Sequence, residues 1–172
     1  MSPLWAAFQS EATSLPSAHR KRRPAGINAS KRTLIPVLFQ RYELPFVTPE
    51  LLFCKNLLLC NRQQTSFYLL VISPERTFRT AEVSHELGVS RLSFAPEDAL
   101  PRLLGLEKGA VSPLGLWFDR EKQVKLILER GLRRPGKIAF HPCDNRATVV
   151  FDQEIFWQRV VPGLAHEYTF VL

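Results

Sequence analysis

Cysteines and long apolar stretches are both scarce in this 172-residue chain. The three cysteines, Cys54, Cys60 and Cys143, are an odd number without the spacing of metal ligands, so neither a disulfide framework nor a zinc site is indicated. Free thiols are typical of a reducing, cytoplasm-like compartment. Every apolar run is shorter than the roughly 18 to 20 residues that a membrane span requires. The sequence therefore predicts a soluble cytoplasmic protein without a membrane partner.

Several familiar enzyme motifs do not occur. The chain has no phosphate-loop motif, no dinucleotide glycine fingerprint, no histidine pair at zinc-binding spacing and no nucleophile elbow around a serine. A thiol nucleophile at Cys143, close to His141, is disfavoured because cysteines in apolar runs are usually inert core residues. These absences exclude the enzyme classes that depend on those motifs.

The formal charge of +7 is concentrated near the amino terminus. Residues 1–35 carry six basic residues and one acidic residue, whereas the remainder of the chain carries 17 and 15. The body of the protein is thus nearly balanced. A polyanionic partner is allowed by charge and has to be argued from a site.

Residues 1–35 contain serine, proline and arginine with little apolar periodicity, which predicts a basic, flexible N-terminal extension without a core of its own. Its composition favours a solvated tail, while an organelle transit peptide and an RNA-gripping arm stay open. Residues 34–46 predict a short packed segment. With 45% hydrophobic content, the chain is long enough for one domain, predicted at residues 36–172.

Strand and helix patterns alternate in the rest of the chain. Two apolar runs at 56–60 and 66–72 flank a polar turn and predict a β-hairpin. Thr80 is expected to cap a helix at 81–87, and Pro96 to open a helix that ends at 104 before Gly105. The other expected elements are strands at 91–94, 123–129, 137–140, 147–151 and 168–172 and a helix at 152–161. This order predicts an α+β single domain with a mixed, mostly antiparallel β-sheet flanked by helices.

Three polar segments stand out against this apolar background. The loop 109–115 has glycine at both ends and Pro113 between small residues, so it suits either a rigid gripping loop or an ordinary turn. Lys55 and Asn56 open a strand, where the lysine is either an anion-binding group or a solvated surface residue. His141, restrained by the following proline, makes either a structural hydrogen bond or part of a site. Asp144 and Asn145 are expected to form a turn.

The order and spacing of four motifs resemble the YbaK/prolyl-tRNA synthetase editing-domain family, and most closely its free-standing alanyl-tRNA(Pro) deacylase branch. The resemblance covers residues 53–172. The motifs are Cys54-Lys55-Asn56-Leu57-Leu58-Leu59, Leu92-Ser93-Phe94-Ala95, Gly109-Ala110-Val111-Ser112-Pro113-Leu114-Gly115 and Phe140-His141-Pro142-Cys143-Asp144-Asn145.

The resemblance implies a YbaK-like fold and a trans-editing hydrolase that cleaves the ester of mischarged tRNA(Pro), most typically alanyl-tRNA(Pro), without a metal or cofactor. It implies catalytic roles for Lys55, Asn56 and His141. The Gly-x-x-x-Pro loop would hold the aminoacyl-adenosine end through its backbone. The expected substrate-binding residues are Ser93, Phe94, Gly109, Ala110, Val111, Ser112, Pro113 and Gly115. An activated ester needs mainly a placed water and dipoles aimed at the developing oxyanion, so the missing carboxylate base is no objection.

Selection of alanine over proline would be a matter of size. A wall of Ser93, Phe94, Val111 and Leu114 would admit a methyl group and reject a pyrrolidine ring, since extra bulk in a packed pocket costs about 1 to 3 kcal/mol. The resemblance leaves cysteinyl-tRNA(Pro) or another small aminoacyl-tRNA as alternative substrates.

A second hypothesis is a non-catalytic module that binds tRNA or a synthetase, because residues 1–50 do not match the family's usual start, which helps to close the pocket. The acceptor end of mischarged tRNA(Pro) is the expected partner, and prolyl-tRNA synthetase is a further one. The four cations Arg91, Arg133, Arg134 and Lys137 are either a weak basic rim that meets the phosphate backbone or scattered solvated charges.

Overall fold

The computed structural model describes residues 50–172. The extension predicted for residues 1–35 and the packed segment predicted for 34–46 therefore lie outside the described residues. The strands are β1 (Leu51–Phe53), β2 (Lys55–Cys60), β3 (Phe67–Ile72), β4 (Ser93–Phe94), β5 (Val124–Glu129), β6 (Lys137–Phe140), β7 (Val149–Asp152) and β8 (Tyr168–Val171). The helical segments are α2 (Thr80–Glu86), α3 (Ala99–Leu104), η1 (Pro113–Trp117), η2 (Arg130–Leu132), α4 (Gln153–Ile155), η3 (Phe156–Val160) and α5 (Val161–Gly163).

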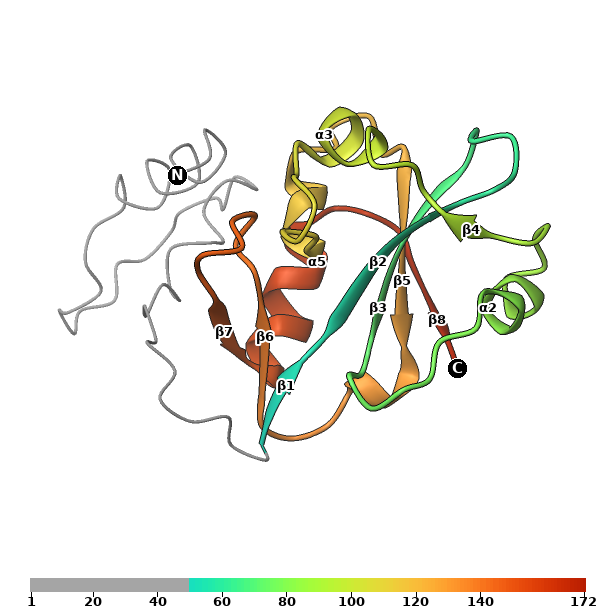
Figure 1. Ribbon diagram of the computed structural model, residues 1–172. Coiled ribbons are helices and arrows are strands. Elements are labelled where there is room, and N and C mark those ends of the chain that lie inside the picture. Colours follow the sequence, from blue (N-terminus) through green and yellow to red (C-terminus); the bar gives the residue numbers. More distant parts are fainter. Residues whose placement is uncertain (1–49) are drawn as a thin grey trace, which may run out of the picture.

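The described strands form two sheets, and the shortest of the three chain connections between them is a single residue. A five-stranded sheet has the order β4-β2-β3-β5-β8, and a three-stranded sheet has the order β1-β6-β7. Strand β1 belongs to the smaller sheet and β2 to the larger one, with Cys54 alone between them (Figure 1). The start of β2 is therefore the point where the two sheets meet.

The α+β class, the single domain and the mixed pairing are confirmed, but the prediction of one mostly antiparallel sheet needs correction. Among the described strands, three pairs are antiparallel (β2 with β3, β2 with β4, β6 with β7) and three are parallel (β1 with β6, β3 with β5, β5 with β8). Parallel neighbours need long crossover connections. The crossover between β3 and β5 contains α2, β4, α3 and η1.

The larger sheet separates two apolar layers. One face carries Leu58, Cys60 and Val71 and packs into the main core, together with α3, η1 and the smaller sheet. The opposite face carries Leu59, Ile72 and other residues that pack with Val83 of α2. Because successive side chains of a strand point to opposite faces, the position of any β2 residue in this alternation tells which layer it faces.

The element boundaries differ from the predicted ones in three places. Helix α2 begins at Thr80 itself, after an extended Arg79, so the side-chain cap predicted for Thr80 is not made. Helix α3 begins at Ala99 and not at Pro96, although Gly105 ends it in the left-handed conformation as predicted. The predicted third helix is confirmed as a helical run from Gln153 to Gly163 with a π-helical part before Pro162, which lacks the N–H that would bond the carbonyl of Gln158.

Gly136, just before β6, lies against the backbone of Glu50, just before β1. Its φ is 113°, and an added Cβ would lie 2.5 Å from the carbonyl oxygen of Glu50, which accepts a hydrogen bond from the Lys137 N–H. We expect Gly136→Ala to lower the free energy of unfolding by about 2 to 4 kcal/mol, because it combines a strained φ with a backbone clash. In urea denaturation the control Gly163→Ala, which meets nothing within 4 Å, should change stability by less than about 1 kcal/mol. Equal effects of the two substitutions would contradict this account.

Candidate functional site

Strand pairing brings the predicted Lys55 segment next to the His141 segment. Strands β1 and β6 are parallel, and their last pair is Phe53 with Ala139. Lys55 and His141 each lie two residues beyond that pair. Because paired strands lie about 4.8 Å apart, the start of β2 and the end of β6 are neighbours in the fold.

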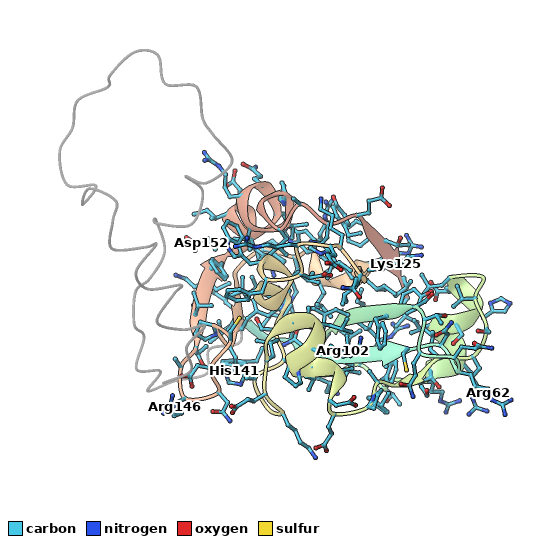
Figure 2. All side chains as sticks on the ribbon, turned by 90° about the horizontal axis from the view of Figure 1, so that it is seen from above. Arg62, Arg102, Lys125, His141, Arg146 and Asp152 are labelled. Atoms are coloured by element: carbon cyan, nitrogen blue, oxygen red, sulfur yellow. The ribbon has the colours of Figure 1, made fainter. Side chains whose placement is uncertain are left out.

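The glycine loop adjoins the same segment from the other side. An added Cβ on Gly109 would lie 3.4 Å from Nδ2 of Asn145. Glu107 acts electrostatically on Arg146 and raises the pKa of its guanidinium, after the larger effect of Asp144. Residues 107–110 and 141–147 thus form two neighbouring loops, and Figure 2 shows His141 and Arg146 together on this side of the molecule. We call these two segments the paired loops.

Asn56 faces the layer in which the paired loops are packed. It alternates with Leu58 and Cys60 and is paired with Val71, and all three belong to the main core, as do Leu114 and Cys143. Its Nδ2 donates weakly to the carbonyl of Cys54 at 3.4 Å, whereas its buried Oδ1 has no partner within residues 50–172. A buried acceptor without a donor costs about 1 to 3 kcal/mol, so Oδ1 of Asn56, like Nε2 of Gln153 elsewhere in the described residues, is a position where a further partner can bind.

Lys55 takes the opposite direction. It is paired with Ile72 and alternates with Leu57 and Leu59, so its side chain starts from the face that α2 covers. Its exposed Nζ donates to the carbonyl oxygen of Arg76 at 3.2 Å. The structure therefore brings the Lys55 backbone to the predicted site but directs its ammonium group to the segment between β3 and α2.

Residues 109–115 are only partly a loop. Ser112, fully buried, caps the 3₁₀ turn η1 by accepting from the N–H of Leu114 at 3.2 Å, so its side chain has a structural role. Pro113 and Gly115 lie buried inside η1, and an added Cβ on Gly115 would lie 2.6 Å from Leu106. Ala110 is buried and donates to the Glu107 carbonyl.

The turn leaves two donors unused. Within residues 50–172, the N–H groups of Val111 and Ser112 make no hydrogen bond. Backbone N–H groups without a partner can bind a carbonyl oxygen or an oxyanion when they point to the same place. What the loop offers to a ligand is thus its backbone rather than its side chains.

The His141 ring is oriented by its own loop. Nδ1 lies 2.9 Å from the carbonyl oxygen of Ala147. Since a carbonyl only accepts, Nδ1 must donate, and in a neutral imidazole Nε2 is then an acceptor. Both readings of the sequence are therefore combined: the histidine makes a structural hydrogen bond, and its second nitrogen can accept from a water or a hydroxyl group.

The loop that follows His141 is held by an ion pair that sequence reasoning missed. Asp144, 6% exposed, accepts from the backbone N–H of Arg146 and, bidentately, from its Nε at 3.0 Å and Nη2 at 2.7 Å. The turn-forming role predicted for Asp144 is consistent with this geometry. Cys143 before it has φ of 60°, a strained conformation for a residue other than glycine. Strained loop residues of this kind cluster at functional sites.

The thiols of Cys54 and Cys143 do not supply a nucleophile. Burial raises the pKa of Cys143 to about 12, and burial together with Glu129 raises the pKa of Cys54 to about 12. Both thiols stay protonated at neutral pH, and only thiolates are good nucleophiles. Within residues 50–172, no three histidine, cysteine or acidic side chains converge as metal ligands.

Ser93 and Phe94 lie apart from the paired loops. Strand β4 pairs with β2 at Leu59 and Cys60, the end of β2 farthest from Asn56. Phe94 is 60% exposed and packs edge-on against Phe78 on the α2 side. Phe94, paired with Leu59, thus lies on the sheet face opposite Val111 and Leu114, whereas Ser93 is paired with Cys60 on the face of the main core.

Comparisons with known proteins agree with the motif pattern. Residues 46–156 match the model of the aminoacyl-tRNA editing domain. The chain belongs to this family. The predicted resemblance to YbaK/prolyl-tRNA synthetase editing domains is thereby confirmed.

Two relatives show how far the likeness extends. The editing domain is 37% identical to prolyl-tRNA editing protein ProX of Acetoanaerobium sticklandii, over 58% of this chain and 61% of that protein. It is 35% identical to prolyl-tRNA synthetase associated domain-containing protein 1 of Danio rerio, over 55% of this chain and 52% of that protein. The chain thus spans less than two thirds of either relative.

Solved structures share the fold at low sequence identity. The hypothetical protein APE2540 superposes with a TM-score of 0.54 at 17% identity, over 71% of this chain and 75% of that one. A candidate trans-editing enzyme for prolyl-tRNA synthetase superposes with a TM-score of 0.51 at 17% identity, over 69% of each chain. In the described part of the editing domain, no helix has both the length and the apolar character needed to cross a membrane.

Proposed function

We propose that the chain is a trans-editing hydrolase that deacylates mischarged tRNA(Pro), with alanyl-tRNA(Pro) as its preferred substrate. The observation that carries the proposal is the unpartnered Oδ1 of Asn56, buried on the sheet face toward the paired loops of an editing domain. A protein named as a prolyl-tRNA editing protein is among its relatives and supports the choice of tRNA.

In this proposal the ester is cleaved through placement. The ester carbonyl accepts from the N–H groups of Val111 and Ser112, which have no other partner in residues 50–172 and stabilise the oxyanion as it forms. Asn56 Oδ1 accepts from a donor on the terminal ribose or on the amino group of the amino acid. His141 Nε2 accepts a hydrogen bond from the attacking water and fixes its direction. An activated ester needs little more, because positioning alone removes much of the barrier.

Size selection rests on fewer residues than the sequence suggested. Val111 and the buried Leu114 pack against the main core beside the loop, whereas Phe94 lies on the other face. These two aliphatic side chains would admit a methyl group and disfavour a pyrrolidine ring by about 1 to 3 kcal/mol.

A specific observation favours a second candidate, a non-catalytic tRNA-binding module of the same family. The Lys55 ammonium donates to Arg76 on the sheet face away from the paired loops. For Lys55 to act on a substrate held by the loops, its exposed side chain must turn around the edge of β2. We also propose that prolyl-tRNA synthetase is a partner of this protein and that the protein is located in the cytoplasm.

Deacylation of a panel of tRNAs distinguishes the two candidates. We expect release of alanine from alanyl-tRNA(Pro), slower release from cysteinyl-tRNA(Pro) and none from prolyl-tRNA(Pro). Lys55→Ala should lower the rate only if the ammonium reaches the substrate. Tight tRNA binding by a natively folded protein without release of any amino acid would contradict the hydrolase and support the binding module.

A further inference from the structure

The connection between β5 and β6 carries a concentrated positive charge. Residues 130–137 contain no acidic residue, and their four cations are Arg130, Arg133, Arg134 and Lys137. The connection starts at the end of the larger sheet where β3 and β5 end and β2 begins. Figure 1 shows it at the opposite end of the strands from the β2–β3 turn. We call this region the basic edge.

Arg133 differs from Arg134 and Lys137 in how its charge is compensated. Arg134 lies 3.8 Å from Glu75, and Lys137 lies 3.5 Å from Asp152. Arg133 has no carboxylate partner within residues 50–172. Its exposed guanidinium instead lies 4.9 Å from the ring centres of both Trp157 and Phe170. Its charge is thus held in place without being neutralised.

The aromatic support beneath Arg133 is rigid. The Trp157 Nε1–H donates to Oε1 of the buried Gln153 at 2.7 Å, which fixes the indole plane. Phe170 packs edge-on against Tyr168, which is 41% exposed. A guanidinium held over the faces of aromatic rings keeps the N–H groups at its edge available to bind another partner. Such a fork suits the oxygens of a phosphate, and an exposed tyrosine suits an unstacked base.

A series of contacts links the basic edge to Lys55. The Lys55 ammonium donates to the Arg76 carbonyl, and the Arg76 guanidinium lies 3.9 Å from the buried carboxylate of Glu129. Glu129 also accepts from the Ser73 N–H at 2.6 Å. Glu75 accepts from the Ser73 hydroxyl at 2.6 Å and pairs with Arg134, the neighbour of Arg133. These contacts connect the start of β2 to Arg134, the residue next to Arg133.

We propose that Arg133 binds the phosphate backbone of the tRNA acceptor arm and guides its 3′ end toward the start of β2. The inference rests on the proposed function and adds the surface by which the tRNA is held. A nucleic-acid backbone presents a regular series of phosphates, which suits residues 130–137 because they carry four basic residues and no acidic one. A protein partner would present isolated carboxylates instead. The role is a positioning one, because Arg133 is separate from the paired loops.

Arg133→Met tests the proposal, since methionine keeps the packing on Trp157 and Phe170 and removes only the charge and the fork. For uncharged tRNA(Pro), the slope of log affinity against log salt concentration should become shallower by about 0.7 to 0.9, the value of one phosphate contact. KM for alanyl-tRNA(Pro) should rise about tenfold with kcat unchanged. Hydrolysis of 3′-O-alanyl-adenosine, which has no phosphate, should not change.

The matched control is Arg62→Met. Arg62 lies in the β2–β3 turn, far from the paired loops in Figure 2, and its loss should change neither the salt slope nor KM. Unchanged salt slope and KM in Arg133→Met would overturn the inference, as would a partner protein that loses affinity while tRNA does not. If the native protein cleaves neither ester, the proposed hydrolase fails, and the salt slope still decides the role of Arg133.

Discussion

Asn56→Leu is expected to lower the rate of alanyl-tRNA(Pro) deacylation by about 10² or more while leaving the protein at least as stable as before. The rate falls because a polar group aimed at the reacting ester is worth about this factor. Stability does not fall, because the substitution removes a buried acceptor that has no partner in the described chain. Single-turnover deacylation and urea denaturation measure the two effects on the same preparation.

Asn61→Leu provides the opposite pattern as a control. The Asn61 side chain caps the β2–β3 turn by accepting from the N–H groups of Thr65 at 2.9 Å and Ser66 at 3.1 Å. Its loss should destabilise the protein by about 1 to 2 kcal/mol and leave the rate per folded molecule unchanged. If Asn56→Leu behaves like Asn61→Leu, then Asn56 is a structural residue and the proposed site is misplaced.

Asp119→Ala is expected to cause the largest loss of stability, about 3 to 5 kcal/mol in denaturant unfolding. Asp119 is buried, and its carboxylate accepts from the N–H groups of Gln123 at 3.0 Å and Val124 at 2.8 Å. It also lies 3.2 Å from Nε2 of the buried His166, whose Nδ1 bonds the Leu164 carbonyl. Without the carboxylate, two backbone donors and an imidazole lose their partner, and the turn into β5 separates from the start of β8.

Asp152→Ala is the matched control for that experiment. Asp152 forms an exposed pair with Lys137 at 3.5 Å, and exposed pairs contribute about 0 to 1 kcal/mol. Asp119→Asn, which keeps one acceptor oxygen, should fall between the two. A loss below about 1 kcal/mol for Asp119→Ala would show that the network around Asp119 does not hold β5 to β8.

The local elements were largely predictable because their signals are local. The hairpin of β2 and β3 follows from two apolar runs around a polar turn, and β6 occupies the predicted residues Lys137–Phe140. The division into two sheets was not predictable, because strands β1 and β2 are separated by Cys54 alone and yet pair in different sheets. The parallel pairing of β3 with β5 was not predictable either. Both segments have the apolar composition of buried strands, and that composition does not specify the relative direction of two strands.

The candidate site was also predictable only in part. The segments around Asn56, Gly109 and His141 were identified from residue types, and the structure gives them neighbouring positions. The side-chain directions were not predictable, because a one-residue step along β2 decides that Asn56 faces the loops while Lys55 faces α2. The ion pair of Asp144 with Arg146 was missed, since Asp-x-Arg in a loop is a common solvated pattern. The stacking of Arg133 joins residues from three separate segments and has no local signal.

The most direct test of the account maps the binding of an amide analogue, 3′-alanylamino-3′-deoxyadenosine, by NMR on the labelled protein. We predict that the side-chain amide of Asn56 and the backbone N–H signals of Val111 and Ser112 shift together and saturate with one dissociation constant. Shifts confined to the α2 side around Arg76 and Phe78, with those three groups unmoved, would contradict the proposal that the aminoacyl ester binds between the paired loops and the start of β2.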